Sequence, residues 1–180
     1  QVVLNKLYSY TALQSTIGAI LLAIVNGKPQ ILTLKEMLQN CIDFQCDIIR
    51  RRTEYDRRKA AERAHILEGL KIALDFIDEV IAIIRNSKTI PESKQALTDR
   101  FGLDDIQTTA IVQMQLGRLA GMEKQKILDE LEEKHAFIKE CDEILASHSR
   151  ILDIVKTESL NLRDKFSDDR RTEISDVAGE

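Results

Sequence analysis

Two pairs of side chains in the sequence have the spacing of metal ligands on one helix face. Glu132 and His135 are three residues apart, and so are His65 and Glu68. A Glu-x-x-His pair occurs in the di-iron sites of helical bundles, but such a site needs a second pair in the same order and two further glutamates. The second pair here runs in the opposite order. We therefore predict solvated helix faces and no metal site.

Motifs for nucleophilic catalysis and for phosphate binding are missing from the sequence. It contains no Walker A loop, no His-Glu-x-x-His, no Cys-x-x-Cys and no nucleophile elbow. The remaining histidine, His148, stands at a break in a predicted helix, where we expect a capping or surface role. The sequence thus predicts that the chain has no catalytic site and binds no cofactor of its own.

The three cysteines, Cys41, Cys46 and Cys141, show neither metal-binding nor redox spacing. All three fall on apolar positions of predicted helices. We interpret them as reduced core residues of a cytoplasmic protein.

Basic residues are concentrated in the stretch 50–63, which contains few large apolar residues. One interpretation is a solvated helical arm stabilised by pairs four residues apart, such as Glu54 with Arg58. The alternative is a patch that faces DNA phosphates and contributes position but no sequence readout. The residues of that candidate patch are Arg50, Arg51, Arg52, Arg57 and Arg58.

The composition indicates an all-helical protein without strong attraction to polyanions. Of the 180 residues 43% are hydrophobic, yet only 4% are aromatic and Trp is absent, so Leu, Ile, Ala and Val must build the core. A net charge of −4 provides no general attraction to DNA or to an anionic membrane. No apolar run approaches the roughly 20 residues that cross a bilayer. Since the chain begins at Gln1 without a Met, we expect a fragment of a longer protein.

One long helical stretch, from Leu34 to about Asn86, organises the chain. It opens with a capping box at Thr33 and Glu36, and no proline interrupts its apolar positions before Pro91. We expect a single helix, or two helices separated by a kink. Such a helix spans roughly 75 Å, far more than a compact chain of this length would accommodate, so it should protrude.

Turn and cap residues predict the remaining elements. Asn26-Gly27 between two apolar runs in 16–33 predicts a β-hairpin, which is apolar on both sides and needs a further surface to cover it. Helices are expected over 89–101, ended by Gly102, over 104–119, and from 123 onward with an interruption at 147–149. Ser149 is the expected new N-cap. The segment 147–167 is heptad-like, and we expect it to pair antiparallel with residues 34–58 as a coiled coil.

The helix predicted over 104–119 carries apolar residues on two sides. One side contains Ile106, Ala110, Ile111 and Met114, and the other contains Val112, Leu116 and Leu119. A small domain has one core, so the second apolar side requires a partner.

Several stretches, in order along nearly the whole chain, resemble the A-subunit family of DNA gyrase and topoisomerase IV. The most specific block is Arg63-Ala64-His65-Ile66-Leu67-Glu68-Gly69-Leu70-Lys71-Ile72-Ala73-Leu74, preceded by Arg51-Arg52-Thr53 and Tyr55. Similar stretches are Asn26-Gly27-Lys28-Pro29, Arg100-Phe101-Gly102-Leu103, Arg118-Leu119-Ala120-Gly121-Met122-Glu123 and Asp168-Asp169-Arg170-Arg171-Thr172-Glu173-Ile174. Residues 112–117 depart from the family pattern, which usually has an acidic residue and an Arg there.

The resemblance implies an all-α exit-gate module, with the gyrase member of the family preferred over topoisomerase IV. It would consist of a long antiparallel coiled-coil hairpin, a helical tip that forms a dimer gate, and a short β-hairpin. The implied division is 1–33 (end of the tower region), 34–63 (first arm), 64–146 (gate), 147–167 (second arm) and 168–180 (charged tail). Ile106, Ala110, Ile111 and Met114 would then form the two-fold interface, and Asp or Lys at Met114 should yield monomers.

The resemblance further implies that the parent enzyme passes one DNA duplex through a transient break in another. Its partners would be a second copy, the gyrase B protein in an A2B2 assembly and double-stranded DNA, in the bacterial cytoplasm. ATP and Mg²⁺ sites would belong to the gyrase B protein, and the catalytic Tyr would lie upstream, because Tyr8, Tyr10 and Tyr55 stand in no matching motif. The alternatives are a generic coiled-coil adaptor, a ferritin-like metal enzyme and a basic-helix DNA binder.

Overall fold

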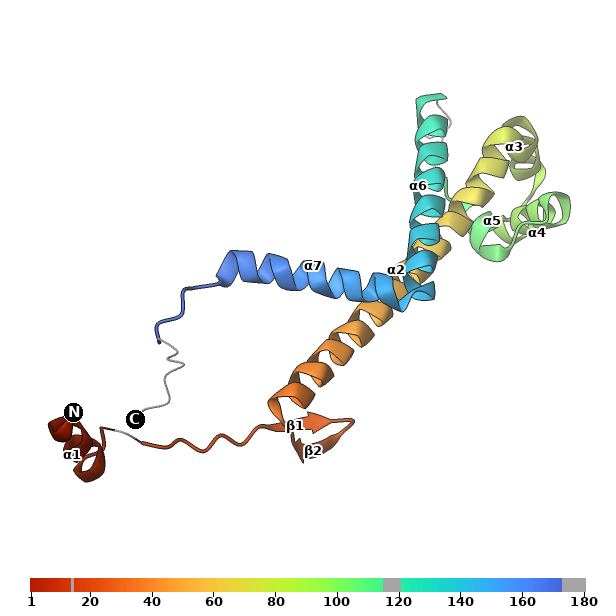
Figure 1. The fold of residues 1–180 in the computed structure, drawn as a ribbon. Helices are drawn as coiled ribbons and strands as arrows, with labels where there is room; N and C mark the ends of the chain where they lie inside the picture. Colours follow the sequence, from red (N-terminus) through yellow and green to blue (C-terminus); the bar gives the residue numbers. More distant parts are fainter. Residues whose placement is uncertain (14, 115–120, 173–180) are drawn as a thin grey trace. The chain divides into compact units, whose positions relative to one another are not determined.

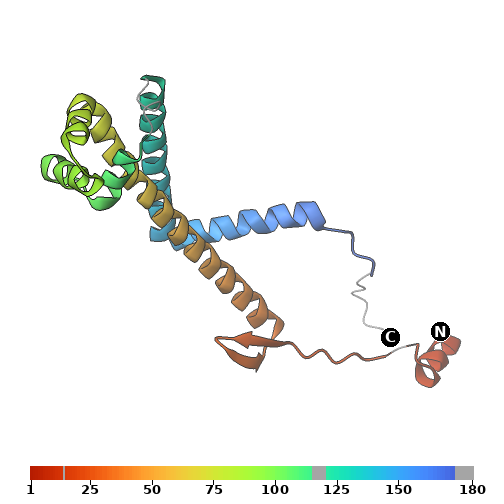
Figure 2. The ribbon, with the colours of Figure 1, turned by 180° about the vertical axis from the view of Figure 1, so that it is seen from behind.

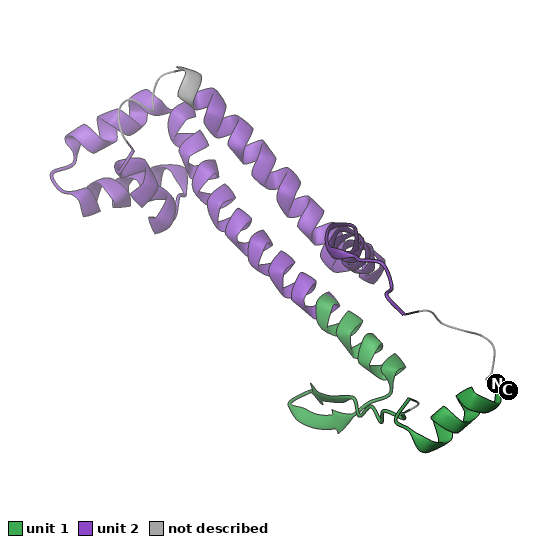
Figure 3. Ribbon diagram, turned by 90° about the vertical axis from the view of Figure 1, so that its left-hand side faces the viewer, with its two compact units in different colours: residues 1–45 green, residues 46–180 purple. Residues whose placement is uncertain are grey.

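The computed structural model describes residues 1–13, 15–114 and 121–172, without the side chains of 121–123. It confirms a predominantly helical chain with one β-hairpin (Figure 1). The residues group into two compact units, 1–45 and 46–180, whose boundary falls inside the longest helix (Figure 3). Each unit is described by itself below.

The first unit contains helix α1 (Val2–Tyr10) and the predicted hairpin, strands β1 (Leu22–Val25) and β2 (Lys28–Ile31). Asn26 and Gly27 both have positive φ, 51° and 76°, as a type I′ turn requires, and Leu22 pairs with Ile31. The strands are shorter than the apolar runs that predicted them. None of the described residues of this unit is buried, so it has no core of its own.

The predicted long helix is interrupted once. Helix α2 (Leu34–Asp75) begins at the capping box, where the Thr33 amide donates to the Glu36 carboxylate at 2.8 Å, a bond that lowers the pKa of Glu36. Helix α3 (Ile77–Asn86) follows after Phe76, which leaves the helical conformation at φ −119°, ψ 38°. The Phe76 ring lies 5.7 Å from the ring of Phe101. Of the two predicted alternatives, two helices with a break is correct.

Two short helices follow with the predicted caps. Helix α4 (Ile90–Phe101) starts at Thr89 and ends at Gly102, whose φ of 68° is the left-handed conformation favoured by glycine. Helix α5 (Asp105–Val112) starts at a capping box formed by Asp104 and Gln107. It is shorter than predicted, and the expected continuation over 115–120 lies outside the described residues.

The last two helices are separated by a single residue. Helix α6 spans Gly121–Ala146 and helix α7 spans His148–Phe166. The N-cap is Ser147 and not Ser149, because the interruption comes two residues earlier than the sequence indicated. Ser149 is therefore an ordinary first-turn residue of α7.

The larger core of the second unit lies where α2 meets α3, α4, α5 and α6. It is built from aliphatic residues, as the composition predicted: Ala64, Leu67, Leu70, Ala73, Leu74, Val80, Leu97, Leu103, Ile111, Ile127 and Leu131. A smaller cluster joins Cys46 and Ile49 of α2 to Ile151 of α7. Helix α7 contacts α2 through Ile151 near its start, while Leu162 and Phe166 near its end are exposed; the predicted pairing of 147–167 with 34–58 stays a prediction.

Ion pairs connect the second-unit part of α2 to α6 and α7. They are Arg52–Glu158 (2.8 Å), Arg57–Asp142, Arg63–Glu130 (2.7 Å) and Asp75–Lys124 (2.9 Å), and Nε2 of His135 lies 3.1 Å from the Glu68 carboxylate. Figure 3 shows α6 running antiparallel beside α2, whereas Figures 1 and 2 show α7 leaving α2 at an angle. The cation is on α2 at Arg63 and on α6 at Lys124, so a reversed α6 would bring like charges together, although each half-exposed pair contributes little.

Gly69 marks a close contact between two helices of the second unit, α2 and α5. A Cβ atom at this position would lie 2.7 Å from Cβ and 2.8 Å from Cγ of Gln107, which is itself buried. Glycine therefore allows the start of α5 to rest directly on α2.

Gly69→Ala should lower the free energy of unfolding by about 1–3 kcal/mol, the usual cost of overpacking. If the added methyl group met no neighbouring atom, alanine would instead raise the free energy of unfolding by up to about 1 kcal/mol, because it favours the helix more than glycine does. The sign of the change in this free energy therefore shows whether Gln107 packs closely on Gly69. Urea unfolding followed by circular dichroism measures it. Gly18→Ala is the control, because no atom lies within 4 Å of its added Cβ; a stabilised Gly69→Ala variant would contradict the packing described.

Candidate functional site

Two polar contacts hold the start of α5 on α2. The Asp104 carboxylate, which accepts from the backbone amide of Gln107 at 2.8 Å within the capping box, also contacts Nε2 of His65 on α2. The Gln107 side-chain amide donates to the His65 carbonyl at 2.8 Å. The Gln107 amide and, secondarily, His65 lower the pKa of Asp104. The helix that carries the predicted interface thus has a fixed position on α2.

The four predicted interface residues have different surroundings. Ile106 is 58% exposed on the first turn of α5, whereas Ile111 is only 2% exposed and belongs to the core of its own chain. Ala110 and Met114 are half-buried and pack against that core. In this arrangement the Ile106 side chain is largely available for contact with a second copy. The side chains of Ala110 and Met114 are partly available, and that of Ile111 is not.

An apolar cavity of about 310 Å³ lies between α3 and the end of α5. We call it the α3–α5 groove; it is lined by Ile77, Val80, Ile81, Ile84, Arg85, Ile111, Val112 and Met114. Met114 and Ile111 come together here, whereas Ile106 is not among the lining residues. The lining residues of α3 were not among the predicted interface residues, although the frequent apolar positions in 77–84 could have indicated them.

Most guanidinium groups of the candidate basic patch are paired within the chain. Arg52 and Arg57 form the ion pairs to α7 and α6, and Arg51 lies 3.6 Å from Asp47. Arg58 lies over the Tyr55 ring at 5.4 Å. Because nearby carboxylates neutralise much of the positive charge, the structure offers little support for a DNA contact at Arg50–Arg58, and that contact stays a prediction.

The candidate metal ligands do not converge. His135 contacts Glu68 of α2 at 3.1 Å instead of joining Glu132, and the described residues contain no group of three potential ligands. His148 is exposed on the first turn of α7. Of the predicted capping or surface role, His148 has the surface one, because the N-cap of α7 is Ser147.

The cysteines are all free thiols, and two of them occupy the predicted core positions. Cys46 and Cys141 are buried, and burial raises the pKa of the Cys141 thiol. Cys41 is exposed, so its assignment to the core was wrong. It lies in the first unit, where the apolar positions of α2 have no buried residues around them.

Comparison with known proteins shows extensive similarity to one family. Residues 1–160 match the family described as the A subunit of DNA gyrase/topoisomerase IV. The chain is 50% identical over 173 residues to the DNA gyrase A subunit of Clostridium acetobutylicum, 49% over 174 residues to that of Halalkalibacterium halodurans, and 47% over 173 residues to that of Staphylococcus aureus. These alignments cover 96–97% of this chain but only 20–21% of each relative. The chain thus spans about a fifth of the length of these relatives.

Among the described helices none combines the length and the apolar content needed to cross a membrane.

Asp104→Asn should reduce the acid sensitivity of the fold. The pKa of Asp104 is lower in the folded state, so its ionised form stabilises the fold above its unfolded pKa, about 3.9, and that stabilisation is lost as the pH falls through the folded pKa. Asparagine keeps the N-cap but cannot titrate. The difference in urea midpoint between pH 7 and pH 3 should therefore shrink.

Asp105→Asn is the control for this experiment, since Asp105 is highly exposed and pairs only with Lys94 at 3.1 Å among the contacts described. An Asp104→Asn variant that keeps the full pH dependence, as the control does, would show that Asp104 does not stabilise the α2–α5 junction through its charge.

Proposed function

The chain belongs to the family of DNA gyrase and topoisomerase IV A subunits, and we propose that it forms the exit gate of such an enzyme. Two copies would meet at a two-fold interface on their helical tips, and the gate would open to release a transported DNA duplex. The proposal rests on the match along nearly the whole chain and on the apolar surface of α3 and α5. It assigns the chain a structural task within a larger enzyme.

The observation that carries the gate proposal is the exposure of Ile106, which lies on the first turn of α5, where contacts with α2 hold the helix in place. Burying a 58% exposed isoleucine against a symmetric copy is favourable, and the α2–α5 junction holds it in place without further loss of entropy. Ala110, Met114 and the α3–α5 groove add apolar surface on the same two helices. In a two-fold dimer both copies would contribute the same surface to the interface, so each of these apolar regions would be buried in both chains.

The proposed division of the chain follows from this assignment. Residues 1–33 would end the tower region, 34–63 and 147–167 would form the two arms, and 64–146 would form the gate. Residues 168–180 would form a charged tail after the second arm.

The remaining features of the parent enzyme are proposed from its family. It would be an ATP-hydrolysing type IIA topoisomerase in the bacterial cytoplasm, assembled with the gyrase B protein as A2B2 and acting on double-stranded DNA. The gyrase B protein would hold ATP and Mg²⁺. The catalytic Tyr would lie outside this chain, since Tyr8, Tyr10 and Tyr55 stand in no sequence motif that matches the family's catalytic Tyr. The relatives named as gyrase favour gyrase over topoisomerase IV.

Ile106→Lys should weaken self-association by at least about tenfold, because a charge would be buried at the centre of the interface. Light scattering coupled to size-exclusion chromatography at several concentrations measures the monomer fraction. Leu162→Lys is the matched control, with 59% exposure on α7 against 58% for Ile106. Met114→Lys is a poorer test, because Met114 also packs against the core.

Equal dimerisation of both variants would refute the choice of α5 as the interface. A monomeric wild-type chain would instead favour the alternative of a coiled-coil adaptor module that acts through another protein.

A further inference from the structure

The α6–α7 bend depends on one residue. Ser147 alone leaves the helical conformation, at φ −127° and ψ 110°, between Ala146 and His148. Its hydroxyl accepts from the Arg150 amide at 3.5 Å, the long limit of a hydrogen bond. No glycine or proline lies nearby to prevent a continuous helix. The bend is therefore held weakly at the residue where it occurs.

A heptad spacing of mostly apolar residues continues across this bend. From Ile127, twelve positions spaced alternately by four and three residues run to Phe166. Nine of them are apolar, and the other three are Lys134, His148 and Ser159. The twelve are Ile127, Leu131, Lys134, Ile138, Cys141, Leu145, His148, Leu152, Val155, Ser159, Leu162 and Phe166. We call them the heptad stripe. A heptad stripe that keeps its phase across a break is the pattern of one continuous coiled-coil helix.

In the bent arrangement the buried face of α7 is rotated but still overlaps the heptad stripe. Ile151 is fully buried against Cys46 and Ile49, and Ile154 and Val155 pack beside it; of these three residues only Val155 belongs to the stripe. Ile151 lies one position before Leu152 of the heptad stripe, which corresponds to about 100° around the helix. Leu162 and Phe166 are consequently 59% and 68% exposed.

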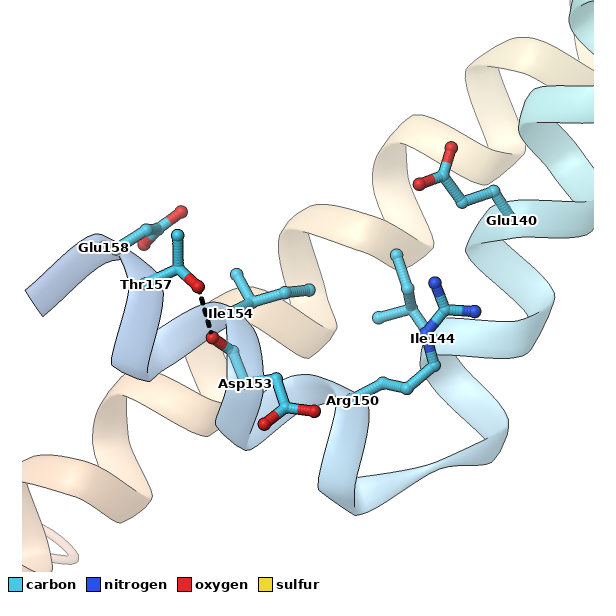
Figure 4. A pocket seen from close by; sticks show the side chains of 7 residues that line it. All are labelled: Glu140, Ile144, Arg150, Asp153, Ile154, Thr157 and Glu158. Carbon is cyan, nitrogen blue, oxygen red and sulfur yellow. Dashed lines mark hydrogen bonds between the residues drawn. The ribbon is translucent and has the colours of Figure 1, made fainter. Parts of the chain in front are cut away.

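The angle between α6 and α7 encloses a cavity of about 450 Å³ (Figure 4). Ile144 of α6 and Ile154 of α7 lie on its two sides, and Arg150 reaches back toward α6 (Figure 4). Arg150 pairs with Glu143 at 2.6 Å, but both side chains are about half exposed, so the pair contributes little. The bend thus leaves open space between α6 and α7, and the only ion pair described between these two helices, Arg150–Glu143, is weak; Ile151 and the Arg52–Glu158 pair hold α7 on α2.

We infer that Ser147 is a hinge between two arrangements of α7. In the bent arrangement α7 rests on α2 through Ile151; in the straight arrangement α6 and α7 form one helix from 121 to 166. Straightening turns Leu152, Leu162 and Phe166 onto the face that Leu131 and Cys141 already present to α2. This inference does not depend on the chain being an exit gate.

Pulsed electron spin resonance between labels at Glu133→Cys and Asp164→Cys tests the hinge in the whole chain. Cys41→Ser removes the exposed native thiol, and an excess of unlabelled chain suppresses signals between copies. A continuous helix separates the labelled backbone positions by about 46 Å. We expect this distance together with a shorter one from the bent arrangement. A single distance, long or short, would overturn the hinge.

Two pairs of variants test which residues determine the ratio of the straight to the bent arrangement. Ser147→Ala removes the cap and should raise the ratio of long to short distances about twofold or more, whereas Ser149→Ala should not. Leu162→Ser should lower that ratio, whereas Leu160→Ser, off the heptad stripe, should leave it unchanged. Equal responses within either pair would overturn the inference.

Discussion

The antiparallel pairing of α2 with α6 is the interaction on which the rest of the second unit depends. Its apolar side includes Leu67 of α2 and Ile127 of α6 in one core, and its charged side reverses sign along α2. The reversal between Arg63 and Asp75 makes one direction of pairing favourable. Once α2 and α6 are paired, the chain between them must form a compact turn, and helices α3 to α5 provide it.

The position of α5 on α2 shows how the packing of the second unit creates a candidate interaction surface. Gly69 lets α5 approach α2 closely, and Asp104 and Gln107 fix its first turn. Ile106 is left pointing away from the core on a helix start that cannot easily move. A preorganised apolar residue suits a symmetric interface that has to form repeatedly, because little entropy is lost each time it closes.

Local signals in the sequence predicted the elements that depend on neighbouring residues. The Asn26-Gly27 turn and the capping box at Asp104 formed as expected, because each is determined within about four residues. The burial of Ile111 and the exposure of Cys41 were not predictable, since helical periodicity shows an apolar face but not what covers it. The N-cap at Ser147 was missed because a second serine two residues later fits the local pattern equally well.

An exit gate requires that this chain close on a second copy of itself. Sedimentation equilibrium of the wild-type chain over a wide concentration range tests this requirement most directly. We predict a mass that rises to about 41 kDa, twice the 20.5 kDa of one chain, and goes no higher, as a closed two-fold dimer requires. A mass that stays at 20.5 kDa at all concentrations would contradict the proposed gate.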